Sequence, residues 1–459
     1  MSDVARHGEA ARTKDSSALV DRLIAQGDPY AALGAYTDIR DAALEELALG
    51  TKRQRLIVAA APYAPADLLA RLSEDADAAL ALRLAKNPSS PAAALARVLE
   101  SDPSARVRSY IAAHANTDPT LLSALAEDEA IEVRRAVSGN AATPPDVIAR
   151  LSAEADEEIA RNAAAAPQTD AETLLHLWNA GDIWVRADVA EHPNCPPEIL
   201  AQAEAADDPL IRRKYAANPA VEDQSLLPLL TDPDERVRAA AVRNLSAPDD
   251  RVAESDDPSA KVRRLFARRA RLPEPLIARL AADPDDWVRR WIARNPDAPE
   301  AVLEDLMRDA IPAVRRGVSR NSSCPPHLLA TLAADAEPWV RAGVALREDA
   351  PEAAISALLD DGDPDVLGAL GRNPATPADR LEIISRNADK DVRRSVAFNP
   401  AAPAAALATL SEDAYPLNRA ILAGRRDLPG DLAERLLTDP EPQVRFAAAA
   451  NLARAAART

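Results

Sequence analysis

The sequence predicts an all-α fold, a solenoid of about sixteen two-helix repeats, and two columns of residues support this prediction. At a spacing of 26 residues, slipping by one at a few joints, each repeat carries an anchor that is most often Asn. Eight positions later every repeat carries Leu, Ile or Val, from Leu69 to Leu432. A fixed period of this length is typical of repeats that bury their apolar faces only by stacking on one another. The anchors are Ala61, Asn87, His114, Asn140, Ala166, His192, Asn218, Asn244, Arg269, Asn295, Asn321, Arg347, Asn373, Asn399, Gly424 and Asn451.

The first helix of a repeat is predicted to be short. In the repeat that begins at Val133, residues Val133, Ala136 and Val137 recur at i, i+3 and i+4, which places them on one face of a helix. Asn140 follows, and because Asn tolerates the left-handed backbone conformation, we expect it to end the helix. This pattern gives a first helix of about two turns.

The second helix of the same repeat is predicted from a start signal. Thr143 is followed by two prolines and an Asp, which matches a Thr cap, Pro at the first helical position and a carboxylate near the positive end of the helix dipole. The side chains of Val147, Ile148 and Leu151 then form the apolar face. The second helix is expected to end at about Ala153.

Two charged columns run through the repeats, an Asp five residues before the Val column and an Arg one residue after it. We expect the carboxylate to cap the first helix and to pair with an Arg of its own or of the adjacent repeat. Calcium binding at the Asp-rich turns is less favoured, because an Arg partner is encoded beside each Asp. The Arg column contains Arg108, Arg134, Arg186, Arg212, Arg238, Arg263, Arg289, Arg315, Arg341, Arg393 and Arg445.

The organisation of the chain follows from where the repeats begin and end. Two departures are expected to change the local curvature, an interrupted second helix at Arg251 and Ser255 and an extra residue near Arg425. The predicted segments are a mobile tail at 1–16, capping helices at 17–53, the repeat solenoid at 54–443 and a final repeat or cap helix at 444–459.

Composition limits the classes of function. The net charge of −18 argues against a protein that coats nucleic acid or anionic membranes over its whole surface. The first residues lack the apolar core of a signal peptide, and the chain has no run of about eighteen apolar residues. We therefore expect an unexported, cytoplasmic protein, and the excess of Arg over Lys together with abundant Ala is typical of GC-rich bacterial genomes.

The segments VRRSVAFNPAAPAAAL, VRRWIARNPDAPEAVL and GALGRNPATPADRLEII, with Asn-Pro-x-x-Pro in each, resemble the leucine-rich repeat variant family. The resemblance covers about residues 54 to 451 and implies a right-handed superhelix in which α-helices alternate with short, 3₁₀-like helices. Some members carry an N-terminal Cys-rich iron–sulfur module, but here no Cys precedes Cys195, so that cofactor is not expected. The spacing of Asp and Val-Arg is also similar to HEAT repeats, which are longer, and 26 residues favour the first family.

Motifs for catalysis or metal binding are missing from the sequence, including nucleophile elbows, phosphate-binding Gly loops and Cys/His clusters. Two of the five histidines, His114 and His192, replace the anchor Asn. Cys195 and Cys324 share one register in repeats too far apart for a disulfide, and each stands where other repeats have a small residue such as Thr143. We expect no enzyme, no cofactor and no metal site.

A basic and aromatic stripe on the first helices of three successive repeats is the strongest candidate for a binding site. Arg pairs recur there at i, i+4, and Trp287 and Trp291 have the same spacing. Trp and Arg are enriched in binding hot spots. The alternative is a solvated face whose arginines pair with nearby acids and whose Trp side chains fill gaps between repeats. The candidate residues are Arg243, Arg264, Arg268, Trp287, Arg290, Trp291, Arg294, Arg316, Arg320 and Trp339.

Two functions are consistent with this stripe. The first is a non-enzymatic scaffold that binds a protein partner carrying an acidic segment. The second is a helical-repeat protein that binds nucleic acid or another polyanion. The acidic charge elsewhere and the lack of a series of stacking aromatics favour the first.

Overall fold

The computed structural model describes residues 44–456 apart from 46, 75, 102 and 247–255. The described part of the chain forms two compact units, an N-terminal and a C-terminal one, which divide at about residue 247. The predicted tail, the predicted capping helices up to residue 43 and the predicted interruption at Arg251 and Ser255 lie outside the described residues. The predicted segment boundaries therefore stay predictions.

The N-terminal unit consists of repeats with two helices each. The first helices are α5 (Lys52–Ala60), α7 (Ala78–Lys86), α9 (Ala105–Ala113), α11 (Ile131–Ser138), α13 (Glu157–Ala165), α15 (Ile183–Glu191), α17 (Pro209–Ala217) and α19 (Glu235–Asn244). The second helices are α6 (Ala66–Leu72), α8 (Ala92–Glu100), α10 (Pro119–Leu125), α12 (Pro145–Ser152), α14 (Ala171–Ala180), α16 (Pro197–Glu204) and α18 (Asp223–Leu226), the last followed by the 3₁₀ helix η1 (Pro228–Thr231).

The C-terminal unit repeats the same pattern. Its first helices are α21 (Ala260–Ala267), α23 (Asp286–Arg294), α25 (Pro312–Ser319), α27 (Pro338–Ala345), α29 (Pro364–Arg372), α31 (Lys390–Ala397), α33 (Pro416–Ala423) and α35 (Pro442–Ala456). Its second helices are α22 (Glu274–Ala281), α24 (Glu300–Leu306), α26 (Pro326–Leu332), α28 (Glu352–Leu358), α30 (Ala378–Ile384), α32 (Ala404–Leu410) and α34 (Gly430–Leu436). The prediction of an all-α fold of two-helix repeats is confirmed.

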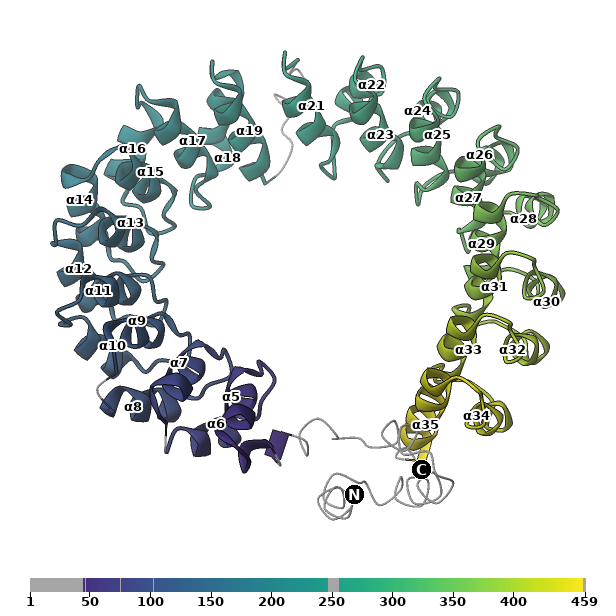
Figure 1. Cartoon of the computed structure of the whole chain (residues 1–459). Coiled ribbons are helices and arrows are strands. Elements are labelled where there is room, and N and C mark those ends of the chain that lie inside the picture. Colours follow the sequence, from purple (N-terminus) through teal and green to yellow (C-terminus); the bar gives the residue numbers. More distant parts are fainter. Residues whose placement is uncertain (1–43, 46, 75, 102, 247–255, 457–459) are drawn as a thin grey trace. The chain divides into compact units, whose positions relative to one another are not determined.

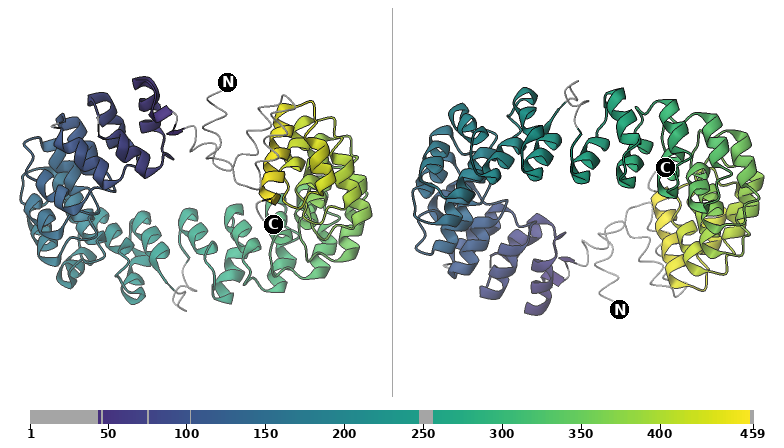
Figure 2. Two further views of the ribbon diagram at one scale, coloured as in Figure 1. Left: turned by 90° about the horizontal axis from the view of Figure 1, so that it is seen from below. Right: turned by 90° about the horizontal axis from the view of Figure 1, so that it is seen from above.

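Within each unit the first helices form one row and the second helices another, with the first helices on the concave side of that unit's row (Figure 1). Figure 2 shows the stacked helices from two further directions. The core of a repeat lies between the rows, where Val288 and Ile292 of α23 and Leu303 of α24 are fully buried. Side chains on the opposite face of a first helix are left available for contacts outside the repeat.

The predicted alternation of α-helices with 3₁₀-like helices is wrong for this chain. Both helices of a repeat are α-helical, and among the described residues a 3₁₀ helix is found at Pro228–Thr231 alone. Seven residues are enough for hydrogen bonds between residues four apart, as between the N–H of Met307 and the carbonyl of Leu303 after α24 (2.9 Å).

The anchor Asn has a different role from the predicted one. Arg271 is the one described non-glycine residue with positive φ, so Asn140 is not left-handed. Its side-chain amide instead donates to the carbonyls of Ala112 and His114 in the preceding repeat (2.7 and 3.0 Å), and its Oδ1 accepts from the N–H of Ala142 (2.9 Å). The anchor therefore connects consecutive repeats through buried carbonyls that have to be satisfied. Ring nitrogens of His114 and His192 bond carbonyls of the preceding repeat in the same way.

The predicted Thr cap is also wrong. Helix α12 has Pro144 at its N-cap without a side-chain capping bond, while the Thr143 hydroxyl donates to the carbonyl of Val137 (2.6 Å). The open carbonyls at the end of α11 need a donor, whereas Pro145 has removed one N–H from the start of α12. Thr143 therefore closes the first helix and does not open the second.

The Asp/Arg columns form the predicted ladder between adjacent repeats. Arg289 Nε lies 2.6 Å from Asp309 Oδ2 in the next repeat, and Arg289 Nη1 donates to the carbonyl of Asp283 (2.8 Å). The ladder Asp is not the helix cap, because Asp285 caps α23 and Asp283 accepts the N–H of Asp285 (2.8 Å). Equivalent pairs are Arg108–Asp128, Arg212–Asp232, Arg263–Asp283, Arg315–Asp335, Arg341–Asp361, Arg393–Asp413 and Arg419–Asp439.

The predicted extra residue near Arg425 is a misalignment. Arg425 itself is the anchor, since its Nη1 donates to the carbonyls of Ala397 and Asn399 (2.7 and 2.8 Å). Asn418, fully buried, takes the place of the usual Val. The 26-residue spacing therefore continues through α33, and a long guanidinium replaces the shorter Asn amide.

Candidate anion-binding surface

The ten predicted binding residues are on first helices or directly after them. Arg243 is exposed on α19 of the N-terminal unit, whereas the other nine belong to the C-terminal unit. Those nine are Arg264 and Arg268 at α21, Trp287, Arg290, Trp291 and Arg294 on α23, Arg316 and Arg320 at α25, and Trp339 on α27.

The face of α23 that carries these residues is opposite to its core. Val288 and Ile292 point toward the second helices and are fully buried, while Trp287 is 46% exposed. A helical period of 3.6 residues places Trp287, Arg290 and Arg294 about half a turn away from the two apolar residues. The stripe therefore lies on the free face of the row of first helices.

Arg264 is paired, which supports the alternative interpretation for this residue. Its guanidinium binds Asp285, the N-cap of α23, with Nη2 at 2.6 Å from Oδ2 and Nε at 2.9 Å from Oδ1. This hydrogen bond, offset in part by burial, raises the pKa of Arg264. In the N-terminal unit Arg135 binds Asp156, the N-cap of α13, in the same register.

Arg290 and Arg316 occupy the register of Arg264 in the next two repeats, but their acidic partner is missing. The position equivalent to Asp285 is Ile311 in the repeat after Arg290. In the repeat after Arg316 it is Glu337, whose carboxylate accepts from Trp339 Nε1 (3.2 Å). Among the described residues no ion pair is formed by the four arginines that we call the Arg cluster, namely Arg290, Arg294, Arg316 and Arg320.

The members of the Arg cluster repel one another. Burial lowers the pKa of Arg294, and the charges of Arg320 and Arg290 lower it further. Burial, followed by the charges of Arg320, Arg294 and Arg290, lowers the pKa of Arg316 as well, and the charge of Asp365 opposes this shift. Guanidinium groups stay protonated in proteins, so this repulsion is a cost that a bound anion would relieve.

Aromatic rings support the arginines. The guanidinium of Arg290 lies 4.0 Å from the ring centre of Trp287 on the same helix. That of Arg316 lies 5.4 Å from the ring centre of Trp339 in the next repeat, and that of Arg268 lies 4.7 Å from Trp291. Such cation–π contacts hold the guanidinium planes in place and leave their N–H groups to other acceptors.

A small cavity of about 60 Å³ lies at the centre of the Arg cluster, lined by the four arginines with Trp287, Trp291, Ala313 and Gly317. Arg316 Nε is buried and has no hydrogen-bond partner. Gly317 allows α25 to approach α23 closely, since a Cβ atom there would lie 2.7 Å from Ala293 Cβ. The close approach brings two pairs of arginines to one cavity.

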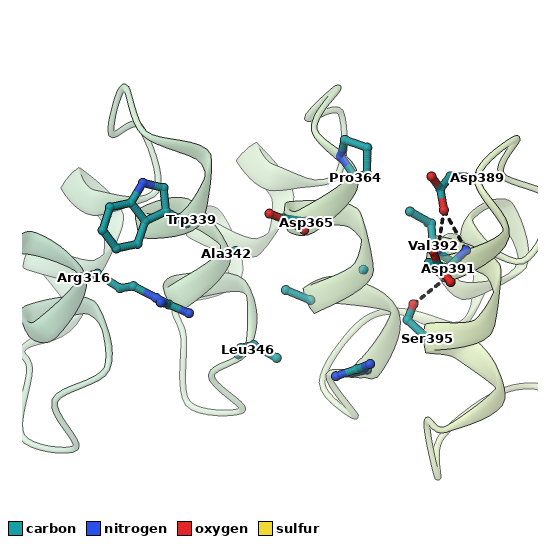
Figure 3. A pocket seen from close by; sticks show the side chains of 13 residues that line it. Arg316, Trp339, Ala342, Leu346, Pro364, Asp365, Asp389, Asp391, Val392 and Ser395 are labelled. Carbon is teal, nitrogen blue, oxygen red and sulfur yellow. Dashed lines mark hydrogen bonds between the residues drawn. The ribbon is translucent and has the colours of Figure 1, made fainter. Parts of the chain in front are cut away.

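A larger cavity of about 440 Å³ adjoins the cluster and shares Arg316 with it. Figure 3 shows Arg316 beside Trp339 at one end and Asp389 and Asp391 at the other, with Asp365 between them. Asp389 is the N-cap of α31. This second cavity therefore carries mixed charge, with Arg316 and Arg372 beside three Asp residues.

Other reactive groups outside the Arg cluster are few in the described part of the chain. Glu300, Glu304 and His327 have ligand atoms within 4.8 Å of one another and could hold a metal ion. His327 Nε2 lies 3.6 Å from Glu300 Oε1 and 3.9 Å from Glu304 Oε1, and such clusters are common on protein surfaces without a metal ion. Cys195 and Cys324 are buried free thiols, and burial raises their pKa to about 12 and about 11. These two thiols are thus poor nucleophiles in the folded protein.

Comparisons with known proteins agree on helical repeats. The family model of the HEAT repeat matches residues 224–247, the segment of α18, η1 and α19. The chain is a helical-repeat protein. No curated protein matches this sequence, and none of the described helices is long and apolar enough to cross a membrane.

Several solved structures are similar to this helical-repeat protein. A leucine-rich repeat variant with a novel repetitive structural motif is 26% identical, with 48% of this chain and 88% of that chain covered, at a TM-score of 0.36. Importin beta in an ammonium sulfate condition is 14% identical, with 86% of this chain and 56% of that chain covered, at a TM-score of 0.25. An engineered protein is 16% identical, with 97% of this chain and 100% of that chain covered, at a TM-score of 0.16. Each TM-score is below 0.5, so the fold rests on the chain's own helices and hydrogen bonds.

Proposed function

We propose that this chain is a non-catalytic scaffold that binds an acidic segment of a partner protein at the Arg cluster. The observation that supports this proposal is the contrast between neighbouring arginines. Arg289 and Arg315 each hold an Asp of the next repeat, while Arg290 and Arg316, one residue further along, form no ion pair with a described carboxylate. In a chain with net charge −18, four arginines without an ion pair among the described residues, on a free helical face, favour an anionic ligand.

Nucleic acid is the second candidate, and two features argue against it. One face of each Trp in the stripe is covered by a guanidinium, which reduces the area available for stacking on bases. The adjoining cavity carries three Asp residues beside Arg316 and Arg372, so it offers a second phosphate along a backbone less positive charge than the Arg cluster does.

The test is a fluorescence anisotropy titration with a fluorescein-labelled, Glu-rich peptide. The double variant Arg290→Gln/Arg316→Gln removes one guanidinium from each of two consecutive first helices. Its matched control is Arg135→Gln/Arg161→Gln, which changes the same register on α11 and α13, where both arginines are paired with Asp. We expect the first variant to weaken binding about tenfold or more and the control to bind as the wild type does.

Two results would contradict the proposal. Equal affinity in both double variants would show that the peptide binds elsewhere. A single-stranded oligonucleotide that binds more tightly than the peptide, with a steep loss of affinity in salt, would favour the second candidate.

A further inference from the structure

The small cavity of the Arg cluster suits one tetrahedral oxyanion. A cavity needs roughly 10–15 Å³ to admit one water molecule. About 60 Å³ therefore accommodates a few oxygen-sized groups, which is the scale of a phosphoryl group.

The charge of the cavity favours a doubly charged anion over a carboxylate. Four guanidiniums line it, and the pKa values of Arg294 and Arg316 are lowered in part by the charges of the others. A carboxylate brings one charge and two acceptor oxygens, whereas a phosphorylated side chain brings about −1.5 to −2 and three strong acceptor oxygens. The guanidinium group of Arg can donate two parallel N–H bonds to two oxygens of one phosphate.

The buried Nε of Arg316 points to a ligand independently of the charge. An unsatisfied buried donor is costly, more so on a charged group. The nearby carboxylate of Glu337 accepts a hydrogen bond from Trp339 Nε1. Because Arg316 lines the cavity, an acceptor oxygen bound there would lie beside this side chain.

The four guanidiniums of the Arg cluster come together on two successive first helices. Arg264 on the preceding helix is neutralised by Asp285, whereas Arg268 there lies over the ring of Trp291. On the following helices the register of Arg290 holds Ala342 and Gly368, and the register of Arg294 holds Leu346 and Arg372. The adjoining cavity contains three Asp residues beside Arg316 and Arg372, so the next phosphates of a nucleic-acid backbone would meet mixed charge.

We infer that the Arg cluster is a site for a single phosphorylated side chain, phosphoserine or phosphothreonine, in the partner protein. This inference rests on the proposed function and specifies its ligand. Phosphorylation of the partner would then switch binding on, because the unmodified hydroxyl offers the four guanidiniums no charge.

The test compares three labelled peptides that differ at one central position, phosphoserine, Glu or Ser, with Gly at the other positions. Anisotropy titrations at one fixed salt concentration should give about tenfold or tighter binding for phosphoserine than for Glu, and no measurable binding for Ser. Inorganic phosphate should displace the phosphoserine peptide, and acetate at equal ionic strength should not. The fluorescence of Trp287 and Trp291 should change with phosphate, because both rings line the cavity.

Two double variants test whether the preference for phosphoserine depends on the Arg cluster. Arg290→Gln/Arg316→Gln should reduce the preference for phosphoserine over Glu to about one, and so should Arg294→Gln/Arg320→Gln, which leaves the buried Nε in place. The control Arg135→Gln/Arg161→Gln should keep the preference. Circular dichroism on each variant confirms that the helices are retained.

The outcomes distinguish this inference from the proposed function. Equal binding of the phosphoserine and Glu peptides would overturn the phosphoryl site and leave an acidic-segment scaffold standing. No binding of either peptide, and none of the Glu-rich peptide, would overturn both. The inference would also be overturned by an oligonucleotide that displaces the phosphoserine peptide at a lower concentration than inorganic phosphate does. Its affinity would then fall with salt as expected for several phosphate contacts.

Discussion

Adjacent arginines on α23 and α25 have opposite surroundings. Arg315 lies 2.6 Å from Asp335, and both side chains are less than a fifth exposed. Arg316, the next residue, forms no ion pair among the described residues and has a buried Nε without a hydrogen bond. Two neighbouring arginines of one helix thus differ: the first connects two repeats, and the second belongs to the proposed binding surface.

Arg315→Gln and Arg316→Gln should therefore differ in stability. The first leaves Asp335 buried without its partner, and we expect the free energy of unfolding to fall by about 1–3 kcal/mol. The second removes repulsion at the cost of one cation–π contact, and should leave the free energy of unfolding within about 0.5 kcal/mol of the wild type or above it. Urea unfolding of both variants measures the difference, and equal losses would contradict the distinction drawn between the two arginines.

The ladder also predicts how stability depends on pH. The hydrogen bond from Arg341, followed by an opposing effect of burial, sets the pKa of Asp361 below its ordinary value. A carboxyl with a lowered pKa in the folded state contributes its stability above the unfolded pKa of about 3.9 and loses it as pH falls through the folded pKa. The hydrogen bond from Arg108 lowers the pKa of Asp128 in the same way, so this carboxyl should also lose its contribution to stability in acid.

We expect the free energy of unfolding to change little with pH through these carboxyls between about pH 5 and 8, and to fall below about pH 4. Arg341→Gln removes the cause of the lowered pKa of Asp361. The gap between wild type and Arg341→Gln in urea unfolding should therefore narrow as pH falls from 7 toward 3. A difference in the free energy of unfolding that widens as pH falls would contradict the predicted role of this ion pair.

At the scale of elements, the contact between α23 and α25 depends on a residue without a side chain. A Cβ atom at Gly317 would approach Ala293 Cβ to 2.7 Å and the carbonyl of Arg290 to 3.2 Å. Ala293 has no flexible side chain to move aside, so the two helices would have to separate. Their separation would also open the cavity of the Arg cluster.

Gly317→Ala should consequently lower stability and weaken binding of the Glu-rich peptide, although Ala is the better helix former. Gly368→Ala on α29 is the matched control, because nothing lies within 4 Å of a Cβ atom there. The control should raise the free energy of unfolding by about 0.5–1 kcal/mol and leave peptide binding unchanged. A stabilised Gly317→Ala variant would show that the approach of α23 to α25 is looser than described.

The repeat, its two helices and its charged ladder could be predicted from the sequence, because all three depend on periodic columns. The roles of Asn140 and Thr143 were predicted wrongly because both interpretations considered one repeat alone. Their hydrogen bonds satisfy carbonyls of the preceding repeat or of the preceding helix. Local propensity does not contain that information.

The candidate site could be predicted in outline, as a stripe of arginines and Trp. Which of these arginines form ion pairs could not be predicted. One signal was present in the sequence. The position that holds Asp285 in one repeat holds Ile311 in the next, and this exchange removes the partner of Arg290. The cavity itself depends on the approach at Gly317, which a column of residues does not reveal.

At the scale of the whole molecule, the arginines fall into two groups, those that pair with Asp between repeats and those of the Arg cluster. The ladder pairs of successive repeats use the arginines of one column to hold the Asp of the next, in both units. The remaining acidic excess, a net charge of −18, disfavours unspecific binding of polyanions and leaves the Arg cluster as a local exception. We therefore expect the Arg cluster to select a short anionic segment over a long polyanion.

The most direct test of this account is hydrogen–deuterium exchange, followed by mass spectrometry, on the full chain with and without the Glu-rich peptide. We expect the peptide to slow exchange in the segments that contain α23 and α25, and to leave α11 and α13 unchanged, since their arginines in the same register are paired. Protection that spreads evenly over all repeats, or that appears at α11 and α13 and not at α23 and α25, would contradict the account.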